Sequence, residues 1–215
     1  MNKDQYLAAR KKRVVTLIKI LKKATQELPR PMSDLIKKQY HNDPFLILIS
    51  CLLSLRARDV VTYPICVKLF KKAQTPQQFL KIPRKELETI IHSIGFYKNK
   101  ARSIHSVCQE LLDRFEGKVP KTKEELLSIK GIGPKTANLI LGVAYDIPAI
   151  CVDTHVHKLS NRLGVVQTTT PLQTEHELEK IVPKSDWIQY NRLLVMCGQN
   201  MRICKPFIEP FIEKK

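Results

Sequence analysis

A glycine turn between two helical patterns constrains the fold of this chain more than any other segment. Residues 130–135 read KGIGPK, with apolar residues at helical spacing on both sides. Glycine adopts the left-handed backbone conformations that tight turns need, and proline is tolerated in the first turn of a helix. The sequence therefore predicts two helices joined by a tight turn, in which Gly131 and Gly133 permit the bend and Ile132 packs into the core.

The helical pattern continues along nearly the whole chain. Helices are expected over residues 45–55, 59–71, 75–80, 84–93, 98–115, 126–129, 134–144 and 154–163. Their ends coincide with proline or glycine, or with residues that cap helices. No segment shows the alternating pattern of paired β-strands or a hairpin signal. We therefore expect an all-α fold.

The N-terminal segment, residues 1–28, has the pattern of a basic amphipathic helix. The residues expected to face the core are Val14, Leu17, Ile18 and Leu21. The basic run at residues 10–13 is best interpreted as a solvated face, with a nuclear address or a nucleic-acid patch as the alternatives.

The charge balance favours a polyanionic partner. Lys and Arg number 37 against 20 Asp and Glu, which gives a formal net charge of +17. Nucleic acid is the simplest such partner, and an anionic membrane surface is the competitor. The sequence shows neither an apolar run of transmembrane length nor a secretory signal. We therefore expect no membrane partner and a cytoplasmic or nucleoid-associated location, or a nuclear one in a eukaryote.

Cysteine and histidine do not predict a metal site. The six cysteines are scattered through apolar segments, so free, buried thiols in a reducing cytosol are expected. His155 and His157 lie two residues apart and would project from different faces of a helix. We expect His155 to face the core and to be hydrogen-bonded rather than to bind a metal.

Lys135 and Asp153 are the clearest candidates for residues that take part in a chemical reaction. Backbone N–H groups at a glycine turn and at the start of a helix attract phosphate. A lysine and a carboxylate beside bound DNA can act as a nucleophile and its electrostatic partner. The residues alone leave other interpretations open. Lys135 can be a phosphate contact or a solvated residue, and Asp153 can be only the N-cap of the helix over 154–163.

Several segments together resemble one family. They are GIGPKTAN and VDTH around these two residues, LLSLRARDVVT and IGFYKNKA upstream, and LLVMCGQNMRICKP downstream. These segments follow one another along the chain in the order typical of that family. Over most of its length, the chain resembles the endonuclease III branch of the helix-hairpin-helix DNA glycosylase superfamily. Within that superfamily, a lysine at the position of Lys135 marks the lyase-competent members.

The resemblance implies a two-lobed all-α fold with a DNA cleft between the lobes. A helical barrel carrying the helix-hairpin-helix would span residues 29–147, and residues 1–28 with 148–215 would form the second lobe. The implied protein is a monomeric bifunctional DNA glycosylase and AP lyase of base excision repair. Its expected partner is double-stranded DNA that contains damaged bases, mainly oxidised pyrimidines, or abasic sites.

The resemblance also assigns roles to the two chemical residues. Lys135 would attack C1′ of the damaged nucleotide to give a Schiff base, and β-elimination would then nick the strand. Asp153 would stabilise the positive charge that develops on the sugar and help to deprotonate the attacking amine. The mechanism implies no metal or organic cofactor.

The DNA contacts are expected in two places. In the first, the turn from Lys130 to Gly133 would hold a phosphate through backbone amides without reading sequence. In the second, the resemblance places a gap-filling residue at Arg56, which would occupy the space left by the flipped base. The alternative is that Arg56 or Arg58 only contacts phosphate. Asp59 is expected to cap the following helix.

The C-terminus departs from the family pattern. Most members close with cysteines spaced C-x6-C-x2-C-x5-C, which hold a [4Fe–4S] cluster. Here Cys204 matches the first, residues 207–215 contain no cysteine, and Cys197 fits the end of the preceding helix. Two thiolates cannot hold the cluster, so a clusterless protein is expected. Phe207, Ile208, Phe211 and Ile212 are expected to pack in its place.

Two alternative functions stay open. The chain could be an AP lyase with weak or different glycosylase specificity, or a non-catalytic helix-hairpin-helix DNA-binding protein. The presence of both Lys135 and Asp153 argues against the second alternative.

Overall fold

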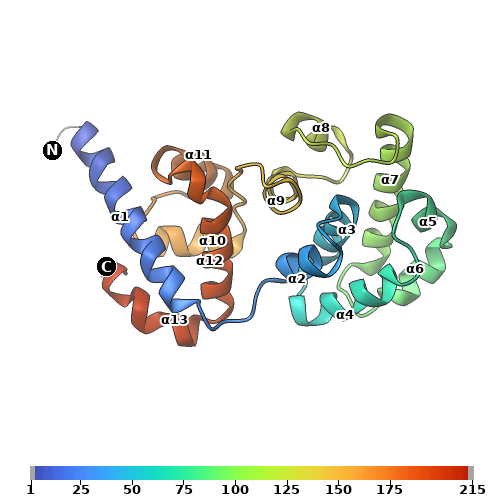
Figure 1. Ribbon diagram of the computed structural model, residues 1–215, viewed down its shortest axis with the longest axis horizontal. Helices are drawn as coiled ribbons and strands as arrows, with labels where there is room; N and C mark the ends of the chain where they lie inside the picture. Colours follow the sequence, from blue (N-terminus) through green and yellow to red (C-terminus); the bar gives the residue numbers. More distant parts are fainter. Residues whose placement is uncertain (1–2, 213–215) are drawn as a thin grey trace. The chain divides into compact units, whose positions relative to one another are not determined.

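The computed structural model describes residues 3–212, and every regular element among them is helical (Figure 1). The helices are α1 (Lys3–Ala24), α2 (Met32–Gln39), α3 (Pro44–Ser54), α4 (Asp59–Phe70), α5 (Pro76–Lys81), α6 (Arg84–Ile90), α7 (Tyr97–Phe115), α8 (Lys123–Ser128), α9 (Pro134–Tyr145), α10 (Thr154–Arg162), α11 (Pro171–Ile181), α12 (Trp187–Gln199) and α13 (Met201–Ile208), with the short 3₁₀ helices η1 (Lys184–Asp186) and η2 (Glu209–Phe211). The all-α expectation is confirmed. None of these described helices is long and apolar enough to cross a membrane.

The chain divides into two compact units. The central unit is Met32–Ile147, and the terminal unit combines Met1–Pro31 with Pro148–Lys215. The first boundary lies after Pro31, close to the position after residue 28 expected from the sequence, and the second lies after Ile147.

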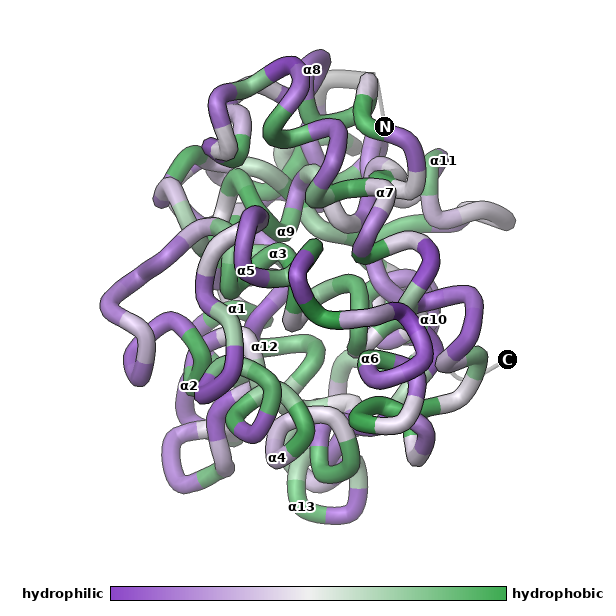
Figure 2. The backbone as a smooth tube through the Cα atoms, turned by 90° about the vertical axis from the view of Figure 1, so that its right-hand side faces the viewer, coloured by the Kyte–Doolittle hydropathy of each residue, from purple (hydrophilic) through white to green (hydrophobic). Residues whose placement is uncertain are grey.

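Helix α3 forms the core of the central unit. Asp43 caps it, because its Oδ1 accepts hydrogen bonds from the amides of Phe45 (2.9 Å) and Leu46 (3.0 Å). Every residue from Phe45 to Leu53 is buried, and the tube near the α3 label in Figure 2 is mostly green, that is, hydrophobic. Helices α2, α4, α7 and α9 pack around it. A helix that is apolar on all sides requires such enclosure.

Helix α1 supplies the core of the terminal unit. The four apolar residues predicted to face inward, Val14, Leu17, Ile18 and Leu21, are at most 3% exposed. They pack against α12 and α13, which lie beside α1 in Figure 1. The inward face of α1 is therefore confirmed.

The basic run at residues 10–13 is only partly solvated. Arg10 donates from Nε and Nη2 to the carbonyl oxygen of Val165 (3.2 and 2.9 Å). Arg13 donates from Nη2 to the carbonyls of Leu163 (2.9 Å) and Phe211 (2.8 Å). The interpretation of the whole run as a solvated face, nuclear address or nucleic-acid patch is wrong for these two arginines. They satisfy backbone carbonyls at the end of α10, in the segment after it, and in η2.

Asp59 does not cap α4. The N-cap position is Arg58, and Asp59 is the first helical residue. Its Oδ2 instead accepts a hydrogen bond from the amide of Met32 at 3.2 Å, so it joins the starts of α2 and α4. The cap prediction was wrong because the carboxylate accepts a hydrogen bond from the amide of Met32, which is distant in the sequence. No local sequence pattern reveals this donor.

The C-terminal apolar residues pack as expected with one exception. Ile208 is fully buried, and Phe211 and Ile212 pack against the core of the terminal unit. Phe207 is 38% exposed. It lies four residues after Ile203, which is also exposed, so the two share the outer face of α13.

Candidate active site

The predicted site residues divide between the two units. The turn of residues 130–133, Lys135, Arg56 and Arg58 belong to the central unit, and Asp153 belongs to the terminal unit.

The glycine turn joins α8 to α9. Its two glycines differ in whether the backbone conformation requires a glycine. Gly131 has φ +96°, a left-handed conformation that favours glycine. Gly133 has φ −97° as the N-cap of α9, so its backbone does not require glycine. A side chain at Gly133 would meet no protein atom within 4 Å. The expectation that both glycines permit the bend is therefore wrong for Gly133, which instead leaves the surface open for a close approach by another molecule.

The turn is held in place by the burial of Ile132 and by hydrogen bonds with residues of α7. Ile132 is 4% exposed, as predicted, and its amide donates to the carbonyl of Ile129 at 3.1 Å. The amide of Lys130 donates to the carboxylate of Glu110 on α7 at 3.1 Å. Arg114, one turn further along α7, donates to the carbonyl of Ser128 at 3.1 Å. Helix α7 thus holds both ends of the segment that leads into the turn.

Two amides of the turn stay available. Within the described part of the chain, the N–H groups of Gly131 and Gly133 donate to no protein acceptor. Both glycines are exposed and stand at the N-terminus of the twelve-residue helix α9. Unpaired amides at a helix N-terminus form a site that suits a phosphate group.

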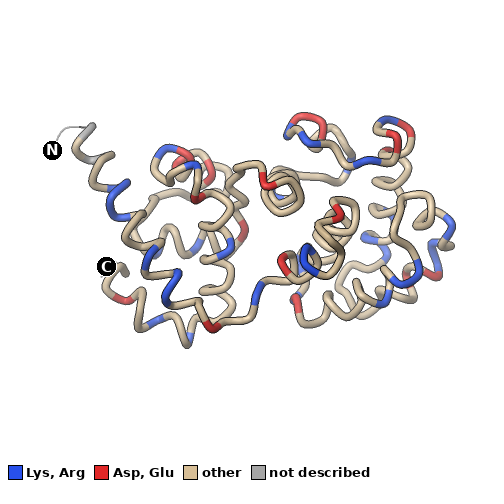
Figure 3. Tube along the Cα trace, in the orientation of Figure 1, with Lys and Arg blue, Asp and Glu red and all other residues tan. Residues whose placement is uncertain are grey.

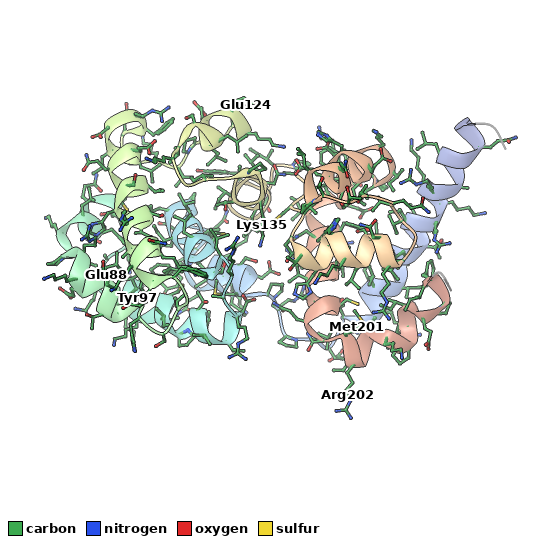
Figure 4. All side chains as sticks on the ribbon, turned by 180° about the vertical axis from the view of Figure 1, so that it is seen from behind. Glu88, Tyr97, Glu124, Lys135, Met201 and Arg202 are labelled. Atoms are coloured by element: carbon green, nitrogen blue, oxygen red, sulfur yellow. The ribbon has the colours of Figure 1, made fainter. Side chains whose placement is uncertain are left out.

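Lys135 lies in the first turn of α9, two residues after Gly133, and its side chain is exposed (Figure 4). The residues behind it, Thr136, Ala137 and Asn138, are buried and hold the helix against the core. Cys51 of α3 is close enough for the Lys135 charge to act on it. Burial nevertheless raises the pKa of the Cys51 thiol to about 12, so this thiol stays neutral beside the lysine.

Asp153 is the N-cap of α10, as one of the two interpretations predicts. Its Oδ1 accepts a hydrogen bond from the amide of Val156 at 2.8 Å. Its Oδ2 accepts none from the residues that the structure describes. One carboxylate oxygen therefore holds the helix and the other stays available for chemistry.

Helix α12 fixes the segment that leads into Asp153. Asn191 donates from Nδ2 to the carbonyl of Cys151, two residues before Asp153, at 2.7 Å. His155, two residues after it, packs directly against Gly198 of α12. These two contacts place the Asp153 backbone from both sides. The sequence does not reveal either contact, because both partners lie far along the chain.

The expectation for His155 was only partly right. The side chain is half-buried against α12, and it has no hydrogen bond to any described residue. His157 is the hydrogen-bonded histidine, since its Nδ1 lies 2.7 Å from the hydroxyl of Thr174. No cluster of three metal-ligating side chains occurs among residues 3–212.

The contact between His155 and Gly198 leads to a stability prediction. A Cβ at residue 198 would lie 2.2 Å from Nδ1 of His155, so Gly198→Ala must displace the ring. We expect this substitution to lower the free energy of unfolding by about 1–3 kcal/mol, the usual cost of overpacking. Urea denaturation measures the effect, with Gly95→Ala as the control because its Cβ would meet nothing within 4 Å. An unchanged or higher midpoint for Gly198→Ala would contradict this packing.

Arg56 and Arg58 lie in the exposed turn between α3 and α4. Arg56 has φ 54° and Phe96, in the turn before α7, has φ 60°. Left-handed conformations of this kind are uncommon outside glycine. The guanidinium of Arg56 lies 6.0 Å from the ring centroid of Phe96, which is itself 61% exposed. The structure thus places a cation and an aromatic ring together on the surface.

Lys100 holds these two turns together, and the sequence interpretation missed it. Its Nζ donates to the carbonyl of Leu53, near the end of α3, at 2.6 Å. Its amide donates to the carbonyl of Phe96 at 3.0 Å. Burial lowers its pKa from 10.5 to about 8. The signal was present in the sequence, because Lys100 falls on the buried stripe of α7 together with Ala101 and Ile104.

The cysteines do not fit an iron–sulfur cluster. All six are buried free thiols, as predicted. In the C-terminal segment, Cys197 and Cys204 form a hydrogen-bonded pair, and Sγ of Cys204 also lies 3.8 Å from the carbonyl of Ala24. Burial raises the pKa of both thiols, whereas a cluster requires four thiolates or an equivalent set. This donor set is too small and its members already have partners.

Comparison with known proteins gives consistent matches. Residues 49–184 match the family model described as HhH-GPD superfamily base excision DNA repair protein. Endonuclease III of Thermotoga maritima is 44% identical over 164 residues, which cover 76% of this chain and 76% of the relative.

Two solved structures share the fold at useful identity. One is a non-covalent endonuclease III–DNA complex, with a TM-score of 0.79 and 34% identity over 88% of this chain and 86% of the other. The second is a trapped endonuclease III–DNA covalent intermediate, with a TM-score of 0.71 and 37% identity over 78% of this chain and 83% of the other.

Proposed function

The chain belongs to the HhH-GPD superfamily of base excision DNA repair proteins, and on that premise we propose that it removes oxidised pyrimidines from duplex DNA with Lys135 as the nucleophile. It is a DNA glycosylase with AP lyase activity. The observation that carries the assignment to Lys135 is its position. It is an exposed amine in the first turn of α9, two residues after the second of two amides that have no protein acceptor.

The proposed reaction begins with the neutral amine of Lys135. The amine forms a bond to C1′ while the N-glycosidic bond breaks, and the base leaves with the bonding electrons and takes up a proton. Opening of the sugar ring gives a Schiff base between C1′ and the lysine nitrogen. Loss of a C2′ proton then expels the 3′ phosphate, which nicks the strand by β-elimination.

Asp153 is proposed to act on the same sugar. Positive charge develops on the deoxyribose as the base departs, and a carboxylate beside it stabilises that charge. Its Oδ1 is held by the amide of Val156, so the group is oriented before the substrate arrives. Preorganisation of this kind avoids a reorientation cost during the reaction.

The DNA contacts are proposed in the central unit. The amides of Gly131 and Gly133 hold one phosphate, and the exposed side chain of Lys130 adds charge next to it. Arg56 fills the gap left by the flipped nucleotide and donates hydrogen bonds to the orphaned base. Arg58, exposed two residues later, contacts the backbone. The contact between Arg56 and Phe96 restricts the arginine before DNA binds.

The protein is further proposed to work as a monomer and without an iron–sulfur cluster. The terminal unit already has a continuous core of its own, to which α13 contributes Cys204 and Ile208. Arg13 supports this segment from α1 through the carbonyl of Phe211, and its guanidinium lies 5.7 Å from the ring centroid of that residue. Apolar packing and this arginine replace the role of a cluster in closing the unit.

Borohydride trapping tests the proposed function. The wild-type protein is incubated with one duplex that contains thymine glycol and one that contains an abasic site, and reduction should leave a covalent adduct on both. The same preparation is assayed for iron and is expected to contain none in stoichiometric amount. Adduct formation on the abasic duplex alone would favour an AP lyase with weak or different glycosylase specificity. If no adduct formed on either duplex, the remaining alternative would be a non-catalytic helix-hairpin-helix DNA-binding protein.

A further inference from the structure

The outer face of α1 carries a cluster of lysines that the proposed reaction does not use. The exposed residues are Lys11, Lys12, Lys19, Lys22 and Lys23. At 3.6 residues per turn they fall within an arc of about 120°, and at 1.5 Å per residue they extend over about 18 Å. Blue segments recur along α1 in Figure 3. We call this surface the α1 lysine face.

No ion pair among the described residues balances these charges. The ammonium group of none of the five lysines forms an ion pair or a hydrogen bond with any residue in the described range 3–212. Lys19 lies three and four residues before Lys22 and Lys23, a spacing at which like charges destabilise a helix by a few tenths of a kcal/mol. Arg10 and Arg13, on the same helix, turn inward instead and bind loop carbonyls. Lys22 and Lys23 lie in the last turn of α1, where a positive charge interacts favourably with the helix dipole. No acidic side chain among the described residues neutralises any of the five charges.

The chemistry of the face favours one class of partner. A membrane-bound amphipathic helix must insert its apolar side, but Leu17 and Leu21 on that side of α1 are fully buried in the core. Protein interfaces centre on large apolar or aromatic anchors. Val15, at 38% exposure, is the one large hydrophobic residue of α1 found exposed in the described chain. Lysine is a flexible point charge that suits phosphate groups without reading sequence.

We propose that the α1 lysine face binds the phosphate backbone of duplex DNA as a sequence-independent surface, separate from the turn of residues 130–133. This inference rests on the proposed function only for the identity of the polyanion. It assigns to α1 the capture and retention of undamaged DNA. Such contacts release counterions, so their number determines how steeply affinity falls with salt.

The test compares salt dependence in two matched variants. In the first, all five lysines of the face become glutamine, which is nearly as good a helix former. In the second, all five become arginine, which keeps the charge. Binding to an undamaged fluorescent duplex is measured from 50 to 200 mM salt. If about three phosphate contacts are lost, the slope of log K against log[salt] should become shallower by about 2.7 in the glutamine variant. Its affinity at 50 mM salt should fall at least about tenfold.

The controls make the outcome decisive. The arginine variant should keep the wild-type slope, and circular dichroism should show unchanged helix content in both. A variant with only Lys19, Lys22 and Lys23 replaced by glutamine should give an intermediate slope, and it serves if the fivefold variant fails to fold. An identical slope in wild type and the folded glutamine variants would overturn the proposal. So would loss of binding to phosphatidylserine vesicles with no change in DNA binding.

This measurement is independent of catalysis. It uses undamaged DNA, so it distinguishes the α1 lysine face from the nucleophile. Suppose that the wild-type protein traps no adduct, but that its salt slope is steeper than that of the glutamine variant by the expected amount. This result would refute the proposed function and support the inference.

Discussion

Lys135→Arg is expected to abolish the borohydride-trapped adduct and strand nicking while binding to abasic DNA stays within about twofold of wild type. Arginine keeps a positive charge in the first turn of α9, but its guanidinium stays protonated in proteins and cannot act as the attacking amine. Losing a nucleophile costs an enzyme several orders of magnitude in rate. We expect nicking of an abasic duplex to fall at least about a thousandfold in single-turnover assays.

The comparison with Lys135→Ala separates chemistry from phosphate binding. Alanine removes both the amine and the charge, so it should lose the adduct and also weaken binding. If Lys135→Arg still gave an adduct, another amine would be the nucleophile. The exposed side chain of Lys130, at the other end of the turn, would then be the first alternative. If both variants retained nicking, Lys135 would be only a contact residue.

Asp153→Asn is expected to reduce base excision by about 10²–10⁴-fold with little effect on stability. Asparagine caps a helix about as well as aspartate does, so the hydrogen bond to the amide of Val156 can persist. The negative charge is lost, and with it the stabilisation of the sugar cation and the acceptance of the lysine proton. Single-turnover excision from a thymine glycol duplex measures the rate, and urea denaturation measures the free energy of unfolding.

Asp153→Ala completes this test because it removes both the charge and the cap. It should lose activity to the same degree and should also lower the free energy of unfolding by about 1 kcal/mol. If Asp153→Asn excised the base at the wild-type rate, Asp153 would act only as a helix cap. A large loss of stability in Asp153→Asn would mean that its activity reflects folding rather than charge.

Much of the local architecture could be predicted because its causes are local. Asp153 caps the helix that follows it, as its position before the apolar spacing of residues 154–163 indicated. Ile132 is buried in the turn, and the inward face of α1 follows its helical period. Hydrogen bonds within a few residues and a period of 3.6 residues need no knowledge of the rest of the chain.

The errors share a different physical origin. Arg10 and Asp59 were assigned by their neighbours in sequence, but each is bound by a backbone group far away in the chain, the carbonyl of Val165 and the amide of Met32. Buried or half-buried backbone groups must find partners, and the nearest charged side chain in space supplies one. Sequence spacing contains no information about which loop that will be.

The sequence by itself determined the helices, the glycine turn and the order of the motifs that include Lys135 and Asp153. It also shows that residues 207–215 contain no cysteine. Only the tertiary structure decided which cations are structural and which are free to meet a polyanion. Arginines 10 and 13 turn into the terminal unit, Lys100 joins two turns of the central unit, and the α1 lysine face stays in solvent. The physical reason is that a side chain's charge is local, whereas its partner is set by packing between segments distant in the chain.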